Sequence, residues 1–240
     1  MRTLLLLLPL FVLAACSGSP TPVVKGVAHT APAAPAPDLV QVRLDSLKAA
    51  AQPGDLVLRL GDDMLSHSIR YLSATDPSYS HAGVVVEQGG AHWVAHIAPD
   101  EVGRDTIRHE PLDSFLNPKK NLSAGLYRYG LSEPQRLRFL EQIDQYARRG
   151  VHFDRTYDLR TEDRLYCSEL VARSLAAASG GALRIREDFV PEGMRPLMYA
   201  YFANEPIKKE EFATRRYISL DQLYLHPSCR PVLLISFRNP

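Results

Sequence analysis

The sequence predicts an α+β fold on three observations. Apolar and β-branched runs typical of strands cluster between residues 55 and 129, whereas helical patterns lie mostly outside that stretch. A turn sequence, residues 88–90 (QGG), separates two of these runs and predicts a β-hairpin. A last apolar run, residues 231–237, predicts one more strand near the C-terminus. Strands and helices are therefore segregated along the chain.

The other elements follow, in chain order, from the spacing of apolar residues. Helical spacing predicts helices over residues 44–51, from a cap at Asp62 to residue 72, over 133–149 and over 195–202. Strand-like patterns cover residues 56–60, 80–87, 91–98, 104–108 and 124–129. Residues 111–116 are predicted to form a short turn or helix, and residues 151–164 are polar and irregular.

The first residues predict an export signal rather than part of the fold. Residues 1–2 are a short positive region, and residues 4–12 form an apolar stretch too short to span a bilayer comfortably. Small residues followed by Cys16 resemble the lipobox of bacterial lipoproteins. The resemblance implies a signal peptide over residues 1–15 and a lipidated Cys16. Ser17 implies, by the same rule, an outer-membrane lipoprotein that faces the periplasm; an ordinary secretory signal is the alternative.

Two further segments follow the signal. Residues 16–39 are rich in Pro, Ala and Ser/Thr, which predicts an extended tether that cannot bury enough apolar surface to fold. Residues 40–240 are long enough for one domain with a sizeable core. The formal net charge of +1 and the lack of a basic stripe exclude nucleic acid as the main partner. The expected membrane contact is therefore the lipid anchor alone.

Residues 166–175 (YCSELVARSL) predict the start of a further helix. Leu170 and Leu175 belong to an apolar face at helical spacing, and residues 179–181 (SGG) supply a C-terminal stop. Cys167 therefore lies in or just before the first turn, where unpaired N–H groups and the helix dipole favour an anion. We expect this position to lower the pKa of the thiol and make it nucleophilic. The alternative is a small buried hydrophobe, which is the usual role of a free cysteine.

A nucleophilic Cys167 needs a base and a group that orients that base. His81 begins one strand of the predicted hairpin and His96 lies towards the end of the other, so strand pairing brings their side chains within hydrogen-bonding reach. His92 shares a strand face with His96 but lies nearer the turn. Solvated or structural roles are expected for the histidines in helical or loop settings, His67, His109, His152 and His226. No disulfide is expected between Cys167 and Cys229, which lies in a loop-like stretch.

Four strings occur in a fixed order, residues 54–59 (GDLVLR), 80–86 (SHAGVVV), 93–96 (WVAH) and 166–171 (YCSELV). Together they resemble the circularly permuted branch of the NlpC-type papain-like hydrolases, most closely the YiiX/YebB-like family, over nearly all of residues 50–240. The lecithin:retinol acyltransferase group is a more distant relative. The resemblance implies a circularly permuted papain-like fold, with an antiparallel sheet packed against helices and the nucleophile at a helix N-terminus.

The same resemblance implies roles for individual residues. Cys167 matches the family's nucleophile, His81 its base and His96 its third polar residue, where relatives often carry glutamate. Asp55 matches the start of the first strand and is expected to be structural. The oxyanion is expected near the backbone N–H of Cys167. The family also has a stretch rich in acidic residues before its cysteine. In this sequence Asp154 and Asp158 match that stretch, and they are expected to line the cleft.

The resulting hypothesis is an exported, lipid-anchored cysteine hydrolase that cleaves amide or ester bonds through a Cys–His thioester mechanism. The expected substrate is a cell-wall peptide or an acylated lipid or amide, and no cofactor is expected. One alternative is a catalytically inactive binding or scaffold lipoprotein of the cell envelope, and another is an acyltransferase of the same fold. A metal site built from the same Cys and His residues is a further alternative, although no CxxC or helical HxxxH pair supports it.

Overall fold

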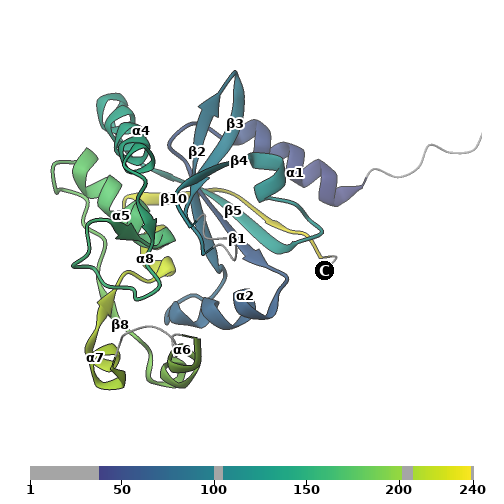
Figure 1. The fold of residues 1–240 in the computed structure, drawn as a ribbon. Coiled ribbons are helices and arrows are strands. Elements are labelled where there is room, and N and C mark those ends of the chain that lie inside the picture. The colour runs from purple at the N-terminus through teal and green to yellow at the C-terminus, as the bar shows by residue number, and fades with distance from the viewer. Residues whose placement is uncertain (1–37, 100–104, 202–207, 239–240) are drawn as a thin grey trace, which may run out of the picture. The chain divides into compact units, whose positions relative to one another are not determined.

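An antiparallel sheet of six strands, all within the residues that the structure describes, forms the centre of the fold (Figure 1). The computed structural model describes residues 38–99, 105–201 and 208–238, so the predicted signal peptide and nearly all of the predicted tether lie outside the described residues. In space the strands are ordered β10-β5-β1-β2-β3-β4. Their bounds are β1 Leu56–Gly61, β2 His81–Gln88, β3 Ala91–His96, β4 Arg108–Pro111, β5 Asn121–Tyr129 and β10 Cys229–Ser236.

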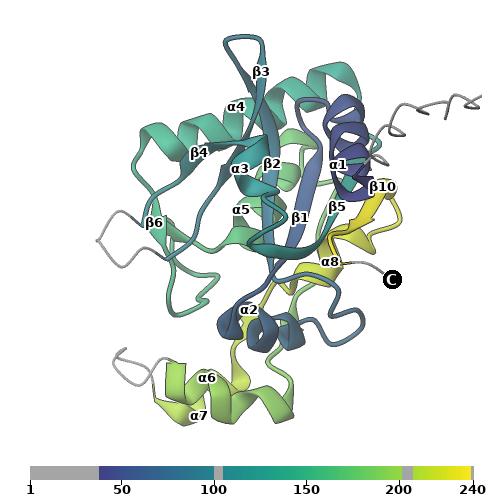
Figure 2. The same ribbon diagram turned by 90° about the vertical axis from the view of Figure 1, so that its right-hand side faces the viewer.

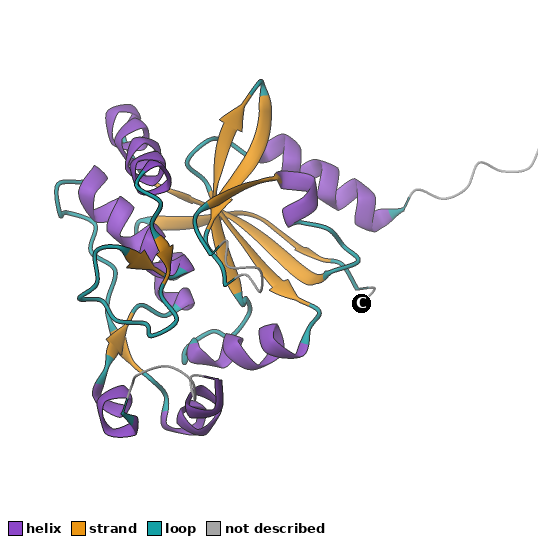
Figure 3. Cartoon of the chain, viewed as in Figure 1, coloured by secondary structure: helices purple, strands orange, loops and turns teal. Residues whose placement is uncertain are grey.

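Helices and two short ladders surround this sheet (Figure 3). The helices before the cysteine are α1 Leu39–Ala50, α2 Met64–Ile69, η1 Arg70–Leu72, α3 Leu112–Phe115 and α4 Glu133–Arg148. The later ones are α5 Cys167–Ala178, η2 Glu192–Met194, α6 Arg195–Tyr201, α7 Lys209–Thr214 and α8 Leu220–Tyr224. The ladders pair β6 His152–Phe153 with β7 Arg164–Leu165, and β8 Asp188–Phe189 with β9 Arg216–Tyr217. The predicted α+β class is confirmed.

Both faces of the sheet are buried, each by its own group of helices. Because successive side chains of a strand point to opposite faces, Leu56 and Leu58 of β1 pack on one side and Val57 on the other. The first side meets Phe139 of α4 and Leu170 of α5. The second side meets α1 and α3. Figure 1 shows α4 and α5 on one side of the sheet and α1 on the other.

Helix α1 begins earlier than the sequence predicts. The side chain of Asp38 accepts hydrogen bonds from the backbone N–H groups of Val40 at 2.9 Å and Gln41 at 3.4 Å, so it caps the helix. Leu39, which the sequence assigns to the tether, is therefore the first helical residue. The cap supplies a start signal that the apolar spacing alone does not reveal.

The strand predicted over residues 104–108 is also displaced. Thr106 forms an isolated bridge with His152, and the N–H of Phe153 donates to the carbonyl oxygen of Asp105 at 2.6 Å. These contacts draw the chain away from the sheet edge, so β4 begins only at Arg108. The displacement matters because it brings the residues that follow Arg108 alongside β3.

Asp55 anchors the start of β1, as its expected structural role requires. Its side chain is 2% exposed and accepts two hydrogen bonds from Arg128 of β5, Nε to Oδ1 at 2.6 Å and Nη2 to Oδ2 at 2.7 Å. The N–H of Gln52 donates to the same carboxylate at 2.8 Å. The carboxylate therefore ties the turn before β1 to the neighbouring strand.

We expect Asp55→Asn to lower the free energy of unfolding by about 3 kcal/mol, because it breaks a buried ion pair from one side. The matched control is Asp45→Asn in α1, whose exposed carboxylate lies 3.6 Å from Lys48 and is worth less than about 1 kcal/mol. Urea denaturation followed by circular dichroism measures both. Equal losses for the two variants would show that Asp55 is not an anchor.

Candidate active site

The β2–β3 hairpin brings together the two histidines that the sequence selects. The strands pair from Val84↔Ala95 to the turn, where Gly89 and Gly90 both have positive φ angles, 58° and 77°. The ring atoms His81 Nε2 and His96 Nδ1 are 2.9 Å apart and form a hydrogen bond. The structure therefore contains the contact that the sequence predicts between His81 and His96.

Gly83 makes room for this pair. A Cβ atom added at Gly83 would lie 2.3 Å from Cγ1 of Val94 and 3.2 Å from the Cβ of His96. Any larger residue would therefore push β3 away from β2 and separate the two imidazoles. The close approach of β2 and β3 therefore explains why residue 83, in the sequence SHAG, is a glycine.

Glu110 extends the pair on the next strand. It lies opposite Val94 on β3 and so faces the same side of the sheet as His96. Its Oε2 lies 3.2 Å from Nε2 of His96, which is ion-pair distance although the N–H is not well aligned for a hydrogen bond. This contact lowers the pKa of the Glu110 carboxyl, whereas burial lowers the pKa of His96. Glu110 is not among the residues predicted from the sequence, because the predicted strand ends at residue 108, before it.

Phe115 of α3 holds these rings in place. It is fully buried, and its ring centroid lies 5.8 Å from that of His81 and 5.2 Å from that of His96. The guanidinium carbon of Arg59 stacks 4.4 Å from the same centroid. Arg59 also donates from Nη1 to the carbonyl oxygen of Phe115 at 3.1 Å. One aromatic side chain therefore fixes both histidines and a neighbouring cation.

Cys167 is the first residue of α5, as the sequence predicts. The residues on either side of it fasten the helix start to a distant part of the chain. The N–H of Ile218 donates to the hydroxyl of Tyr166 at 2.7 Å, and the hydroxyl of Ser168 donates to the carbonyl oxygen of Ile218 at 2.7 Å. The position of the thiol is therefore set by tertiary contacts as well as by the helix.

Cys167 and His81 line the same cavity, whose volume is ≈ 370 Å³. His96 is 2% exposed and lies behind His81, so only one of the two histidines reaches the cavity. No hydrogen bond links the thiol of Cys167 directly to the His81 ring among the described contacts. Such a bond commonly forms only when substrate is bound.

The expected lowering of the Cys167 pKa is wrong. Burial raises the pKa of the thiol and outweighs the N–H groups of Ala82, Ser168 and Cys167 itself, which favour the thiolate together with the charge of Arg59. Burial, followed by the charge of Arg59, places the pKa of His81 well below its usual range. Both shifts disfavour a thiolate–imidazolium ion pair relative to a neutral thiol beside a neutral imidazole.

We expect the rate of Cys167 alkylation by iodoacetamide, followed by mass spectrometry, to show an apparent pKa above the ~8.5 of an ordinary thiol. Arg59→Gln should move the inflection to still higher pH, because removal of the positive charge disfavours the thiolate. Arg160→Gln, which lies outside this cavity, is the control and should leave the profile unchanged. An apparent pKa below that of a free thiol would show that burial does not dominate the titration of Cys167.

Asp154 and Asp158 do not line the cavity of Cys167, contrary to the expectation from the sequence. Asp154 is fully buried and accepts hydrogen bonds from the N–H and the hydroxyl of Thr156 at 2.8 and 2.7 Å. It organises the loop before the cysteine helix. Asp158 accepts a bond from Arg160 Nε at 2.8 Å, and this contact lowers its pKa to about 2.

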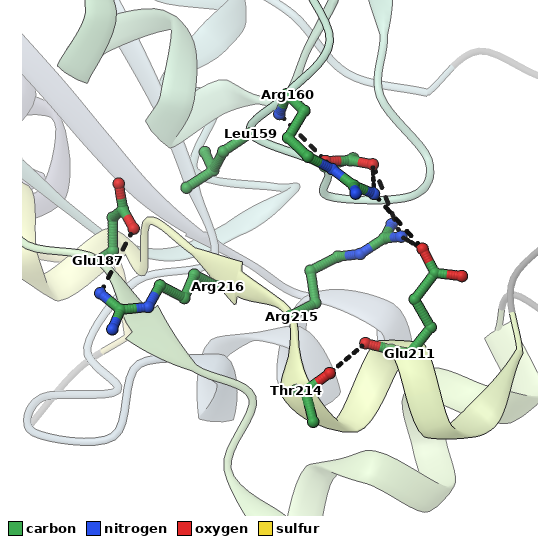
Figure 4. A pocket seen from close by; sticks show the side chains of 8 residues that line it. Leu159, Arg160, Glu187, Glu211, Thr214, Arg215 and Arg216 are labelled. Carbon is green, nitrogen blue, oxygen red and sulfur yellow. Dashed lines mark hydrogen bonds and ion pairs between the residues drawn. The ribbon is translucent and has the colours of Figure 1, made fainter.

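A second cavity, with a volume of ≈ 460 Å³, lies next to Arg160 and α7 (Figure 4). Arg160 and Arg215 both approach Glu211, with Nη2–Oε1 distances of 3.4 and 2.7 Å. Arg216 lies 3.7 Å from Glu187. Every arginine that lines this second cavity therefore already has a carboxylate partner, and the arrangement is that of a surface ion-pair network.

Cys229 lies apart from the site. It begins β10 opposite Tyr129, and both Cys229 and Cys167 are free thiols, so the expectation of no disulfide is confirmed. Burial raises the pKa of Cys229 to about 12. Cys229 does not line the cavity of Cys167, which makes it a suitable reference thiol.

Comparisons with known proteins agree with this geometry. The family model described as permuted papain-like amidase enzyme, YaeF/YiiX, C92 family, matches residues 50–194. Among solved structures, the chain is similar to the crystal structure of metalloprotein yiiX from Escherichia coli O157:H7, with a TM-score of 0.60 and 18% identity. That likeness covers 76% of this chain and 97% of the other. No curated protein matches the chain.

The name of that structure raises the question of a metal site. In the described part of the present chain, no group of three or more His, Cys, Asp or Glu side chains is placed to hold a metal ion. His81, His96 and Glu110 form a row in which each contacts the next, rather than a cluster around one point. The described side chains of this site therefore do not converge on one point, as the ligands of a metal ion do.

The order of the site along the chain also fits the family description. In papain-like enzymes the cysteine precedes its histidine, whereas here His81 precedes Cys167, as a circular permutation requires. The family match covers more than half of the chain, from residue 50 to residue 194. The chain belongs to the permuted papain-like amidase family.

Proposed function

We propose that this protein is a cysteine hydrolase that cleaves amide or ester bonds through a thioester on Cys167. The observation that carries the proposal is one cavity lined by Cys167 and His81, with His81 bonded at 2.9 Å to His96 and His96 in contact with Glu110. A nucleophile, a base and groups that orient the base are the parts that acyl transfer requires.

The chemistry begins from a neutral pair. As the sulfur of Cys167 attacks the substrate carbonyl, His81 takes the thiol proton, and the backbone N–H of Cys167 stabilises the oxyanion. His81 then gives this proton to the leaving nitrogen or oxygen, the bond to the leaving group breaks, and a thioester remains. Water attacks the thioester, its proton passes through His81 to the sulfur, and the free acid leaves.

Glu110 gives His81 the tautomer that this chemistry needs. The negative charge of an ionised carboxylate 3.2 Å from Nε2 favours the tautomer of His96 with the proton on Nε2 and an acceptor at Nδ1, even without a well-aligned hydrogen bond. His96 Nδ1 must then receive a proton from Nε2 of His81, because the two atoms are 2.9 Å apart. Nδ1 of His81 is left unprotonated and able to take the proton of Cys167. Glu110 and His96 are therefore positioning residues that act through His81.

We expect Glu110→Gln to lower kcat by about 10- to 100-fold with little change in KM, because the amide can also donate and so no longer fixes the tautomer of His96. Glu87→Gln, an exposed glutamate on β2, is the matched control. The assay is hydrolysis of p-nitrophenyl butyrate and of N-acetylated peptides across pH. Equal rates for the two variants would remove Glu110 from the mechanism.

The alternatives are an inactive binding or scaffold protein and an acyltransferase of the same fold. Hydrolysis by the wild-type protein that disappears in Cys167→Ser excludes the first. Transfer of the acyl group to an added amine or alcohol in preference to water would favour the second.

The setting of this reaction is also a proposal. We propose that Cys16 carries a lipid that anchors the chain in the outer membrane, with the catalytic domain facing the periplasm and acting on cell-wall peptides or acylated lipids. The lipobox-like residues before Cys16 support this placement. Within the described residues, none of the helices has the length and apolar character needed to cross a bilayer.

A further inference from the structure

Basic side chains outnumber acidic ones in the described lining of the cavity that contains Cys167. Among the residues that the structure describes, three basic side chains, Arg59, Arg108 and Lys120, line it beside one acidic side chain, Asp63. Asp63 is already engaged, because it accepts bonds from the N–H of Ser66 at 2.8 Å and from its hydroxyl at 2.7 Å as the cap of α2. The described part of the lining therefore carries more positive than negative charge.

Two of these cations have no salt bridge within the described part of the chain. Arg59 is half-buried, and its contacts are the carbonyl oxygen and the ring of Phe115. Lys120 is exposed. In the second cavity, by contrast, each arginine faces a carboxylate (Figure 4). The charges of Glu110 and Asp63 act on Arg59 only from beyond salt-bridge distance, whereas burial opposes its charge. A bound anion in direct contact would therefore stabilise the half-buried guanidinium.

The position of Arg59 indicates which part of the substrate carries the anion. Arg59 of β1 lies directly opposite His81 of β2 in the sheet register. His81 is the group that gives a proton to the leaving nitrogen, so the leaving amine must lie beside it. The nearest unpaired cation therefore faces the leaving group rather than the acyl group.

The rest of the lining fits an apolar acyl group. Leu65 and Ile69 of α2 line the cavity together with Phe153, Tyr157 and Tyr201. Figures 1 and 2 both show α2 and α6, which ends at Tyr201, at the same end of the sheet. The cavity thus offers Arg59 from the sheet, Lys120 from the turn before β5, and an apolar wall from other elements.

We propose that the substrate is an N-acylated amino acid, in which the leaving amine carries a free carboxylate that Arg59 and Lys120 recognise. The proposal rests on the proposed function and narrows its substrate. The amide C–N bond breaks and one water is consumed, so the products are a carboxylic acid and a free amino acid. The C-terminal bond of a peptide and the amide of a fatty acyl amino acid share this chemistry.

The first test measures anion recognition without requiring turnover. Iodoacetate and iodoacetamide alkylate cysteine alike but differ by one carboxylate, so their rate ratio at Cys167 reports on the charge of the cavity. Relative to the same ratio for glutathione, we expect about a 10-fold preference for iodoacetate at low salt, which falls in about 1 M salt. Arg59→Gln and Lys120→Gln should each reduce it, whereas Arg160→Gln, from the second cavity, should not. A ratio equal to that of glutathione would overturn the proposal.

The second test compares N-octanoylalanine and N-acetyl-trialanine with their C-terminal amides, with the released amine measured by mass spectrometry. We expect at least about 10-fold higher kcat/KM for the carboxylates, lost in Lys120→Gln. A preference for the acid over the amide with N-octanoylalanine would identify a fatty acyl amino acid as the substrate. The same preference with N-acetyl-trialanine would identify a peptide. Equal hydrolysis of acids and amides overturns the substrate class but leaves the hydrolase. A raised alkylation ratio without any hydrolysis overturns both the proposed function and this substrate class.

Discussion

Replacing Cys167 with serine is expected to lower the hydrolysis of p-nitrophenyl butyrate and of N-acyl amino acids by about 1000-fold or more. The substitution exchanges one atom and leaves the fold almost unchanged, but an alcohol gives up its proton far less readily than a thiol. His81, whose pKa burial holds well below its usual range, is too weak a base to activate the hydroxyl. Steady-state kinetics of the purified variant measures the loss.

Cys229→Ser is the matched control for this loss. Cys229 is the other free thiol of the described chain and lies on β10, outside the cavity. We expect its replacement to leave kcat within about 2-fold of the wild-type value. If the two serine variants were equally active, or equally inactive, Cys167 would not be the nucleophile.

Replacing His81 with alanine is expected to cost about 1000-fold on amide substrates and distinctly less on the activated ester. An amine leaves only when it is protonated, which is the second task of His81, whereas p-nitrophenolate leaves without a proton. The ratio of the two losses therefore reports on proton donation separately from thiol activation. Kinetics on paired amide and ester substrates measures it.

His92→Ala is the control for this variant, because His92 lies on the same hairpin opposite Glu87 and does not line the cavity. It should leave both rates nearly unchanged. Equal losses on amide and ester in His81→Ala would show that His81 does not protonate the leaving group, and a loss no greater than that of His92→Ala would remove it as the base.

Local sequence patterns predict much of this site. The QGG turn and the two flanking apolar runs predict the hairpin, and the hairpin alone brings His81 and His96 together. The helical spacing after residue 166 places Cys167 at a helix start. Both inferences depend on residues close in sequence, where periodicity and turn chemistry dominate.

Other features depend on contacts between distant segments, which a single sequence does not reveal. Glu110 reaches His96 through the register of β4 on β3, and β4 begins only after the bridge that Thr106 forms with His152. The helix start favours the thiolate of Cys167, as expected, but burial by the surrounding tertiary structure is the larger effect and reverses the pKa shift. Burial of this kind is a property of the packed fold.

If the reaction passes through a thioester on Cys167, the acyl group must be found on that sulfur during turnover, and the mass of the protein reveals it. The wild-type protein is mixed with p-nitrophenyl butyrate, quenched in acid during the first turnovers, and digested for mass spectrometry. We expect a butyryl group on the peptide that contains Cys167, and none in Cys167→Ser. Turnover with no acyl adduct, or an adduct confined to another residue such as Cys229, would show that the reaction does not pass through a thioester on Cys167.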